Sequence, residues 1–129
     1  MTASTAQLSN YRQSPRKVRL IADLIRGRNV ANALALLSTL PKRGSDPMAK
    51  LLLSAVSNAK TDASTLYISK IEVNGGVVFK RQMPRARGRA SMIRKKTSVI
   101  TLALSAALPK SAKKAKKAVA KSFDSAQDK

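Results

Sequence analysis

One stretch of the sequence constrains the fold more than any other feature, because it contains no acidic residue. Between residues 73 and 122 there is no Asp or Glu, whereas 14 Lys or Arg residues lie there. Cations without acids to meet them repel one another, so a hairpin built from the most basic part of this stretch could not collapse onto its own domain. We therefore divide the chain into a better balanced globular part, a basic arm at residues 80–96 and a basic tail at residues 109–129.

The arm combines this charge with small or rigid residues. Eight of its residues are Lys or Arg, and Pro84, Gly88 and two alanines lie among them. Extended patterns flank the arm: residues 66–73 are rich in β-branched and aromatic side chains, and apolar residues alternate over residues 96–104. These patterns predict one long β-hairpin. The alternative is a disordered basic loop, because blocks of like charge are often disordered.

Three apolar repeats at helical spacing predict three helices in the globular part. The first spans residues 15–26, with Ser14 expected to cap it through its side chain. The second spans residues 30–40, and the third spans residues 47–60 with Asp46 as its cap. The stripes expected to face a core are Val18, Ile21, Leu24 and Ile25; Val30, Ala33, Leu34, Leu37 and Leu40; and Met48, Leu51, Leu52, Ala55, Val56 and Ala59.

Strands are expected before and after the helices. The odd-numbered residues from 67 to 73 are predicted to share one strand face, because successive side chains of a strand point to opposite faces. Residues 74–76, Asn-Gly-Gly, suit a tight turn or a bulge, after which an extended pattern resumes. The even-numbered residues from 100 to 104 are predicted to face one way. A short strand at residues 5–11 is expected to pair with this last strand.

The residue types disfavour catalysis and metal binding. The chain has no Cys, His or Trp, and its six acids are scattered without a paired-carboxylate spacing. We therefore expect neither an enzyme nor a metal site nor a cofactor. Residues 1–6 lack a basic region followed by an apolar stretch, and no apolar run is long enough to span a bilayer. A cytoplasmic protein without membrane contact is expected.

The net charge of +20 predicts a polyanionic partner, and nucleic acid is the first candidate because each neutralised phosphate releases counterions. Besides the arm, cations gather where the first helix starts, an end that already favours anions. They are Arg12, Arg16, Lys17 and Arg19. A solvated helix face is the other interpretation of these residues. Two Tyr and two Phe are too few for base-stacking readout of a single strand.

Several segments resemble the bacterial large-subunit ribosomal protein L twenty-two family, also called uL twenty-two. They are Ser-Pro-Arg-Lys-Val-Arg-Leu-Ile-Ala-Asp-Leu-Ile-Arg-Gly at residues 14–27, Leu-Ser-Ala-Val-Ser-Asn-Ala at 53–59, Lys-Arg-Gln-Met-Pro-Arg-Ala-Arg-Gly-Arg-Ala at 80–90 and Lys-Thr-Ser-Val-Ile-Thr at 96–101. In order and spacing, the resemblance covers residues 11–104. The chain departs from the family pattern at residues 74–77, where two acids are replaced, at Phe79 and at Val99.

The resemblance implies an α+β fold, with three helices packed on a small antiparallel three-stranded sheet and a long protruding β-hairpin at residues 78–98. It implies one ribosomal protein domain over residues 1–108. Residues 109–129 lie outside the resemblance, and their lysine–alanine composition predicts a disordered basic tail. It also implies binding to large-subunit ribosomal RNA, support for its assembly, and a hairpin tip that lines the nascent-peptide exit tunnel. The implied partners are that RNA, ribosomal protein L four at the tunnel constriction and the nascent peptide.

The residues expected to bind ribosomal RNA come from the helix start and from the arm. They are Arg12, Arg16, Lys17, Arg19, Lys80, Arg81, Arg85, Arg87, Arg89, Arg94, Lys95 and Lys96. The tunnel tip implied by the resemblance is Arg85, Ala86, Arg87, Gly88, Arg89 and Ala90. A nucleoid-like DNA-binding protein is the alternative supported by charge alone. A membrane-active protein is disfavoured, because the arm lacks an amphipathic apolar face.

Overall fold

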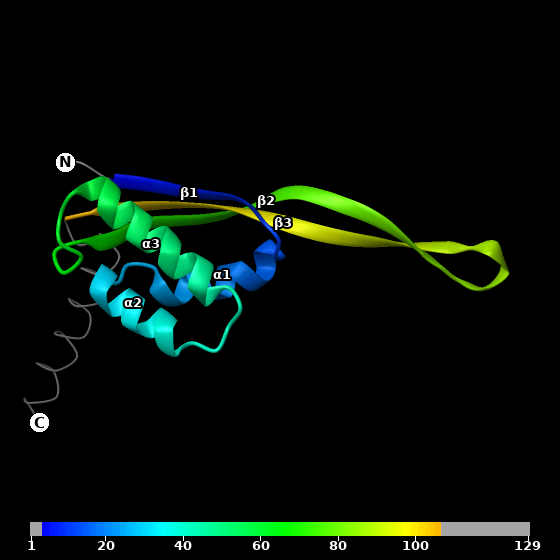
Figure 1. Cartoon of the computed structure of the whole chain (residues 1–129), viewed down its shortest axis with the longest axis horizontal. Coiled ribbons are helices and arrows are strands. Elements are labelled where there is room, and N and C mark those ends of the chain that lie inside the picture. The colour runs from blue at the N-terminus through cyan, green and yellow to red at the C-terminus, as the bar shows by residue number, and fades with distance from the viewer. Residues whose placement is uncertain (1–3, 107–129) are drawn as a thin grey trace, which may run out of the picture.

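A three-stranded antiparallel sheet organises the computed structural model, which describes residues 4–106, and three helices lie along one side of it (Figure 1). The α+β fold expected from the sequence is confirmed. The elements in chain order are β1 (Ser4–Tyr11), α1 (Pro15–Ile25), α2 (Val30–Thr39), α3 (Ser45–Ala59), β2 (Tyr67–Pro84), the 3₁₀ turn η1 (Ala86–Gly88) and β3 (Ala90–Ser105).

The last strand lies at the centre of the sheet. The strand order is β1-β3-β2, and β3 pairs antiparallel with both neighbours. The predicted pairing of the N-terminal strand with the last strand is therefore confirmed, with Ser4 opposite Leu104 and Leu8 opposite Ile100. Strands β2 and β3 continue far beyond β1 and the helices, and together they form the projecting hairpin (Figure 1).

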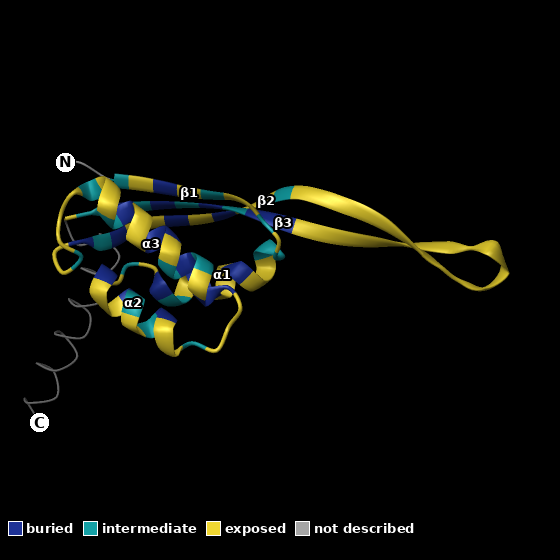
Figure 2. Cartoon of the chain, viewed as in Figure 1, coloured by how far each residue is buried: buried dark blue, intermediate teal, exposed yellow. Residues whose placement is uncertain are grey.

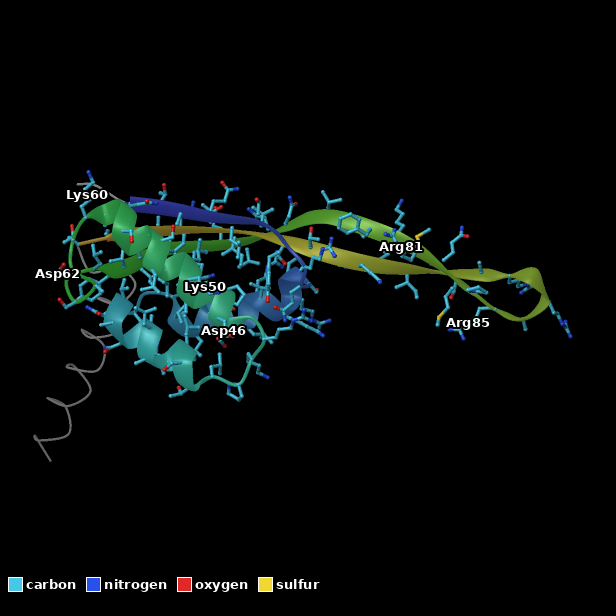
Figure 3. All side chains as sticks on the ribbon, in the orientation of Figure 1. Asp46, Lys50, Lys60, Asp62, Arg81 and Arg85 are labelled. Carbon is cyan, nitrogen blue, oxygen red and sulfur yellow. The ribbon has the colours of Figure 1, made fainter. Side chains whose placement is uncertain are left out.

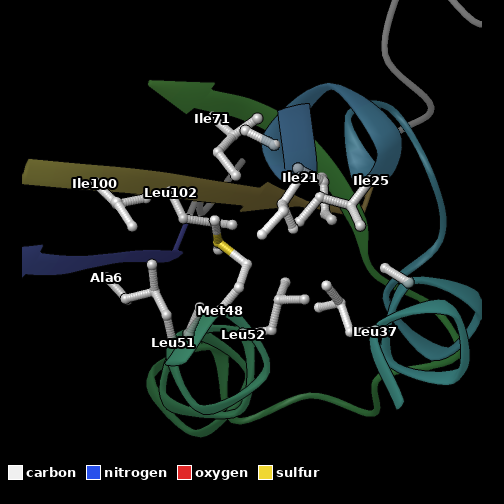
Figure 4. Packing of buried hydrophobic residues seen from close by; sticks show 14 of the residues in the cluster. Ala6, Ile21, Ile25, Leu37, Met48, Leu51, Leu52, Ile71, Ile100 and Leu102 are labelled. Carbon is white, nitrogen blue, oxygen red and sulfur yellow. The ribbon is translucent and has the colours of Figure 1, made fainter. Parts of the chain in front are cut away.

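The core lies between the helices and the inner part of the sheet (Figure 4). Most of the predicted stripe residues are buried there, and Ile25, Leu52 and Leu102 have no exposed surface. Leu24, Leu34, Leu40, Val56 and Ala59 are only partly buried. Because the hydrophobic effect scales with the apolar area removed from water, this cluster is the main source of stability for the fold.

The starts of two helices differ from the prediction. Ser14 occupies the cap position of α1, yet among the described residues its side chain makes no capping hydrogen bond. The third helix begins at Ser45 with Gly44 as its cap, so the prediction of Asp46 as the cap was wrong. The Ser45 hydroxyl instead donates to the Leu40 carbonyl (3.0 Å), which fixes the connection from α2 as α3 begins.

Two bulges interrupt the β2–β3 ladder. The first lies between Ile68 and Lys70, and it shifts the alternation, so that Ile68 is buried and Ser69 is exposed. The prediction that residues 67, 69, 71 and 73 share one face was therefore wrong, although Ile71 and Val73 are buried as expected. The second lies between Gly75 and Val78, where the sequence suggested a turn or a bulge. The expected disordered tail at residues 109–129 lies outside the described residues.

Candidate RNA interface

The outer hairpin is a regular two-stranded ribbon. Its ladder runs from the Val78–Lys96 pair to the Pro84–Ala90 pair, so the predicted hairpin is confirmed. Two residues of the tip, Arg87 (φ 58°) and Gly88 (φ 69°), adopt left-handed backbone conformations. The Arg85 N–H donates to the Arg89 carbonyl (2.8 Å) and closes the turn. Glycine adopts such a conformation without strain, whereas an arginine does so at some cost.

Every residue from 77 to 96 is exposed to solvent (Figure 2). Lys80 lies directly opposite Arg94 across the two strands, and like charges in that position destabilise a sheet. The sequence offers no acid between residues 73 and 122 to offset them. The outer hairpin thus carries a charge that the rest of the described chain does not neutralise, and this charge favours binding to an anionic partner.

The three arginines at the tip lie far from the globular part. Arg85 and Arg81 lie at separate places along the arm, Arg81 nearer the body and Arg85 nearer the tip (Figure 3). The Arg85 Nε donates weakly to the Ser91 hydroxyl (3.4 Å). The tip is slender, because it consists of two strands joined by the short η1 turn.

A basic concavity lies where the hairpin leaves the globular part, and we call it the root concavity. Its volume is about 920 Å³. Three segments of the chain form it: the start of α1, the connection between α2 and α3, and the two strands of the hairpin. Its lining residues are Arg12, Gln13, Ser14, Arg16, Lys17, Arg43, Phe79, Arg81, Arg94, Lys95, Lys96 and Thr97. Eight of these side chains are cationic and none is acidic.

Two hydrogen bonds of neutral hydroxyls and one cation–π contact fix the walls of the root concavity. The buried Ser98 hydroxyl donates to the Gln13 carbonyl and joins β3 to the segment that precedes α1. The Tyr11 hydroxyl donates to the Arg43 carbonyl (3.4 Å), which holds the α2–α3 connection against the same segment. The Arg12 guanidinium lies 5.8 Å from the centre of the Phe79 ring, a cation–π contact across the concavity.

Arg19 of α1 and Arg26, the residue directly after α1, turn toward the edge strand β2 instead. Arg19 donates to the Val73 carbonyl through Nε (3.1 Å) and Nη2 (3.0 Å). Arg26 donates to the Ile71 carbonyl (3.3 Å) and forms an ion pair with Asp23 (3.1 Å). These contacts satisfy carbonyl groups of an edge strand, which would otherwise be open to pairing with another chain.

The structure therefore divides the residues expected from the sequence into groups. Seven of them meet in the root concavity: Arg12, Arg16, Lys17, Arg81, Arg94, Lys95 and Lys96. Arg85, Arg87 and Arg89 lie at the tip, Lys80 lies on the stem outside the concavity, and Arg19 contacts β2. Sequence reasoning missed Arg43, because a lone Lys-Arg pair in a connection between helices does not reveal which surface it approaches.

Other kinds of site find little support in residues 4–106. No three side chains of the types that bind metals lie together there. Within the same part of the chain, no helix has the length and apolar character needed to cross a membrane. Within the described residues, the basic surface of the outer hairpin and the root concavity is thus the best candidate for a binding site.

Comparison with known proteins gives one consistent family. The sequence model of the family described as Ribosomal protein L22p/L17e matches residues 6–105. The chain is 48% identical over 109 residues to the large ribosomal subunit protein uL22 of Lacticaseibacillus casei, covering 81% of this chain and 93% of that protein. It is 49% identical over 106 residues to the uL22 of Pelobacter propionicus, covering 79% and 96%. For the uL22 of Geotalea uraniireducens the identity is 50% over 105 residues, covering 78% and 95%.

Proposed function

The chain belongs to the family of ribosomal protein L22p/L17e, and from that premise we propose that it is a structural constituent of the large ribosomal subunit that binds large-subunit ribosomal RNA. The observation that carries this proposal is the outer hairpin, whose residues are all exposed and whose cations form no ion pair with any acid of residues 4–106. RNA supplies the missing anions at regular spacing along its backbone. The role is architectural rather than catalytic.

The chemistry of the outer hairpin suits RNA in two ways. Arginine presents a planar fork of donors that fits phosphate and can also stack on bases. Exposed apolar side chains lie among the cations, including Phe79 (40% exposed), Met83 (46%) and Met92 (56%). Such side chains can contact the faces of bases and sugars. The proposed RNA contacts are Arg12, Arg16, Lys17, Arg43, Lys80, Arg81, Arg85, Arg87, Arg89, Arg94, Lys95 and Lys96.

The tip at residues 85–90 is proposed to reach through the RNA to the wall of the nascent-peptide exit tunnel, beside ribosomal protein L four. The slender ribbon supports this, because a two-stranded hairpin can pass between packed RNA helices where a globular part cannot. Ala86, Gly88 and Ala90 give the tip little bulk, so its backbone can lie close to a neighbouring surface. Residues 109–129 are proposed as an accessory basic tail outside the ribosomal domain.

Sedimentation of a tagged copy of the chain tests the first part of the proposal. Extracts of cells that produce the tagged chain are separated on sucrose gradients in moderate salt, and the chain is expected in the large-subunit fractions. Recovery with chromosomal DNA would favour the nucleoid-like alternative. Recovery only as free protein would contradict ribosome membership.

Photo-crosslinking from the tip tests the tunnel placement. A photoreactive residue at position 87, in the tip, is expected to capture nascent peptide on translating ribosomes. The same residue at position 101, on the inner part of β3, is the matched control and should capture none. Equal capture from both positions, or none from position 87, would contradict the placement of the tip.

A further inference from the structure

We infer that the root concavity is a preformed site for clustered phosphates, namely a stretch of RNA backbone that brings two or more phosphates close together. The inference rests on the proposed function, because it specifies the RNA feature that this one surface receives. Sequence alone placed these cations in separate segments, and the fold brings them to one concavity.

Charge balance indicates several phosphates rather than one. Eight cationic side chains line the concavity without an acid among its lining residues. A phosphodiester carries a single negative charge, so one phosphate would leave most of the cations unpaired. Asp23, an acid of the same helix, is engaged with Arg26 (3.1 Å) away from the concavity. Consecutive nucleotides of one strand, or two strands that approach each other, supply phosphates in that number.

The site is preformed because neutral groups hold its backbone. Thr97 and Ser98 are buried, and their hydroxyls donate to the Val77 carbonyl (2.7 Å) and the Gln13 carbonyl. The Tyr11 hydroxyl adds a longer, exposed hydrogen bond to the Arg43 carbonyl (3.4 Å). None of these contacts uses a charged head group. These contacts position the cations without engaging their charged groups. A ligand therefore needs to order little of the protein on binding.

The start of α1 adds a fixed positive field. Ser14 and Arg16 line the concavity, and the first turn of α1 contains no acid. The N-terminal end of a helix carries partial positive charge on N–H groups that have no partner within the helix. Since this field comes from the backbone, it remains when individual lysines or arginines are replaced.

Titration of the free full-length chain with pyrophosphate and with orthophosphate tests the inference. At constant ionic strength, the amide NMR signals of residues 14, 16, 17 and 95–97 should saturate with pyrophosphate at about fivefold or more lower concentration than with orthophosphate. The tip signals of residues 86–90 should show only weak shifts, because the tip has no concavity. Equal responses at root and tip, or no preference for pyrophosphate, would overturn the inference.

Two neighbouring cations supply a matched pair of variants. Arg43 and Lys42 are both exposed in the α2–α3 connection, but only Arg43 lines the root concavity. Arg43→Gln should weaken pyrophosphate binding by about threefold to fivefold, whereas Lys42→Gln should weaken it by less than about twofold. An equal loss in both variants would mean that net charge alone acts, and the inference would be wrong. Unchanged amide spectra elsewhere verify that both variants fold.

Sedimentation separates a failure of this inference from a failure of the proposed function. If the chain sediments with large subunits but shows no pyrophosphate preference, the proposed function is supported and the phosphate site is ruled out. If the root concavity saturates with pyrophosphate but the chain never enters the large subunit, the phosphate site is supported and the proposed function is ruled out.

Discussion

The inner and outer halves of the β2–β3 hairpin share one ladder but lie in opposite environments. In the inner half three cross-strand pairs are buried on both strands: Ile68–Leu104, Ile71–Leu102 and Val73–Ile100. In the outer half, from the Val78–Lys96 pair to the tip, every residue is exposed (Figure 2). The backbone hydrogen bonding is of the same kind in both halves, so the difference lies in what the side chains contact.

This comparison shows that backbone pairing and stability are separate properties of the hairpin. The inner half is stabilised by burial against the helices, whereas an isolated two-stranded ribbon is marginally stable in water. The outer half also places Lys80 opposite Arg94. We therefore expect the inner half to determine whether the chain folds, and the part of the outer half beyond the root concavity to acquire its full rigidity when RNA neutralises it.

Replacing the same residue type in each half gives the largest expected contrast. Ile100 is 1% exposed and Ile93 is 39% exposed on the same strand. Ile100→Ala should lower the free energy of unfolding by about 2–5 kcal/mol, because it leaves a cavity in the core. Ile93→Ala should lower it by less than about 1 kcal/mol. Urea denaturation of the two variants measures both values.

The boundary between the halves offers a second, smaller contrast. A Cβ at Gly76 would lie 2.5 Å from the Thr97 Oγ1, whereas a Cβ at Gly75 would have nothing within 4 Å. Thr97 is buried and its hydroxyl is bonded to Val77, so it cannot easily move aside. Gly76→Ala should therefore cost about 1–3 kcal/mol of unfolding free energy.

Gly75→Ala is the matched control, and its effect should stay within about 0.5 kcal/mol. If both glycines tolerate alanine equally, the contact between Gly76 and Thr97 does not fix the bulge. The bulge between Gly75 and Val78 would then be flexible rather than fixed, and the root concavity would lose part of its preformed geometry.

Periodicity and charge were enough to predict the three helices, the hairpin and the basic character of the arm. They could not predict the bulge beside Ser69, because a bulge depends on the register of β2 against β3 rather than on the local sequence. They also could not place Arg43, which reaches the interface only through the packing of the α2–α3 connection against Tyr11. Arg19 is similar, because a helix stripe does not reveal that its guanidinium meets the carbonyl of Val73.

The third contrast compares two arginines of α1, and its expected effects are the smallest. Arg19 donates twice to the Val73 carbonyl of the inner half, whereas Arg16 lines the root concavity. Arg19→Gln should lower the free energy of unfolding by about 1 kcal/mol, because it leaves an edge-strand carbonyl without its donors. Arg16→Gln should leave stability unchanged or raise it slightly, since it removes a cation from the positive end of the helix.

For RNA binding, Arg16→Gln should have the larger effect and Arg19→Gln the smaller one. The slope of log Kobs against log salt, measured with large-subunit RNA, should fall in magnitude by about 1 for Arg16→Gln. For Arg19→Gln the change should be less than half as large, because two of its donors already serve β2. If Arg19→Gln also lowers the magnitude of the slope by about 1 and leaves the free energy of unfolding unchanged, Arg19 leaves Val73 to contact phosphate. Arg19 would then bind RNA rather than stabilise the inner half of the hairpin, and α1 would contact RNA along both of these faces.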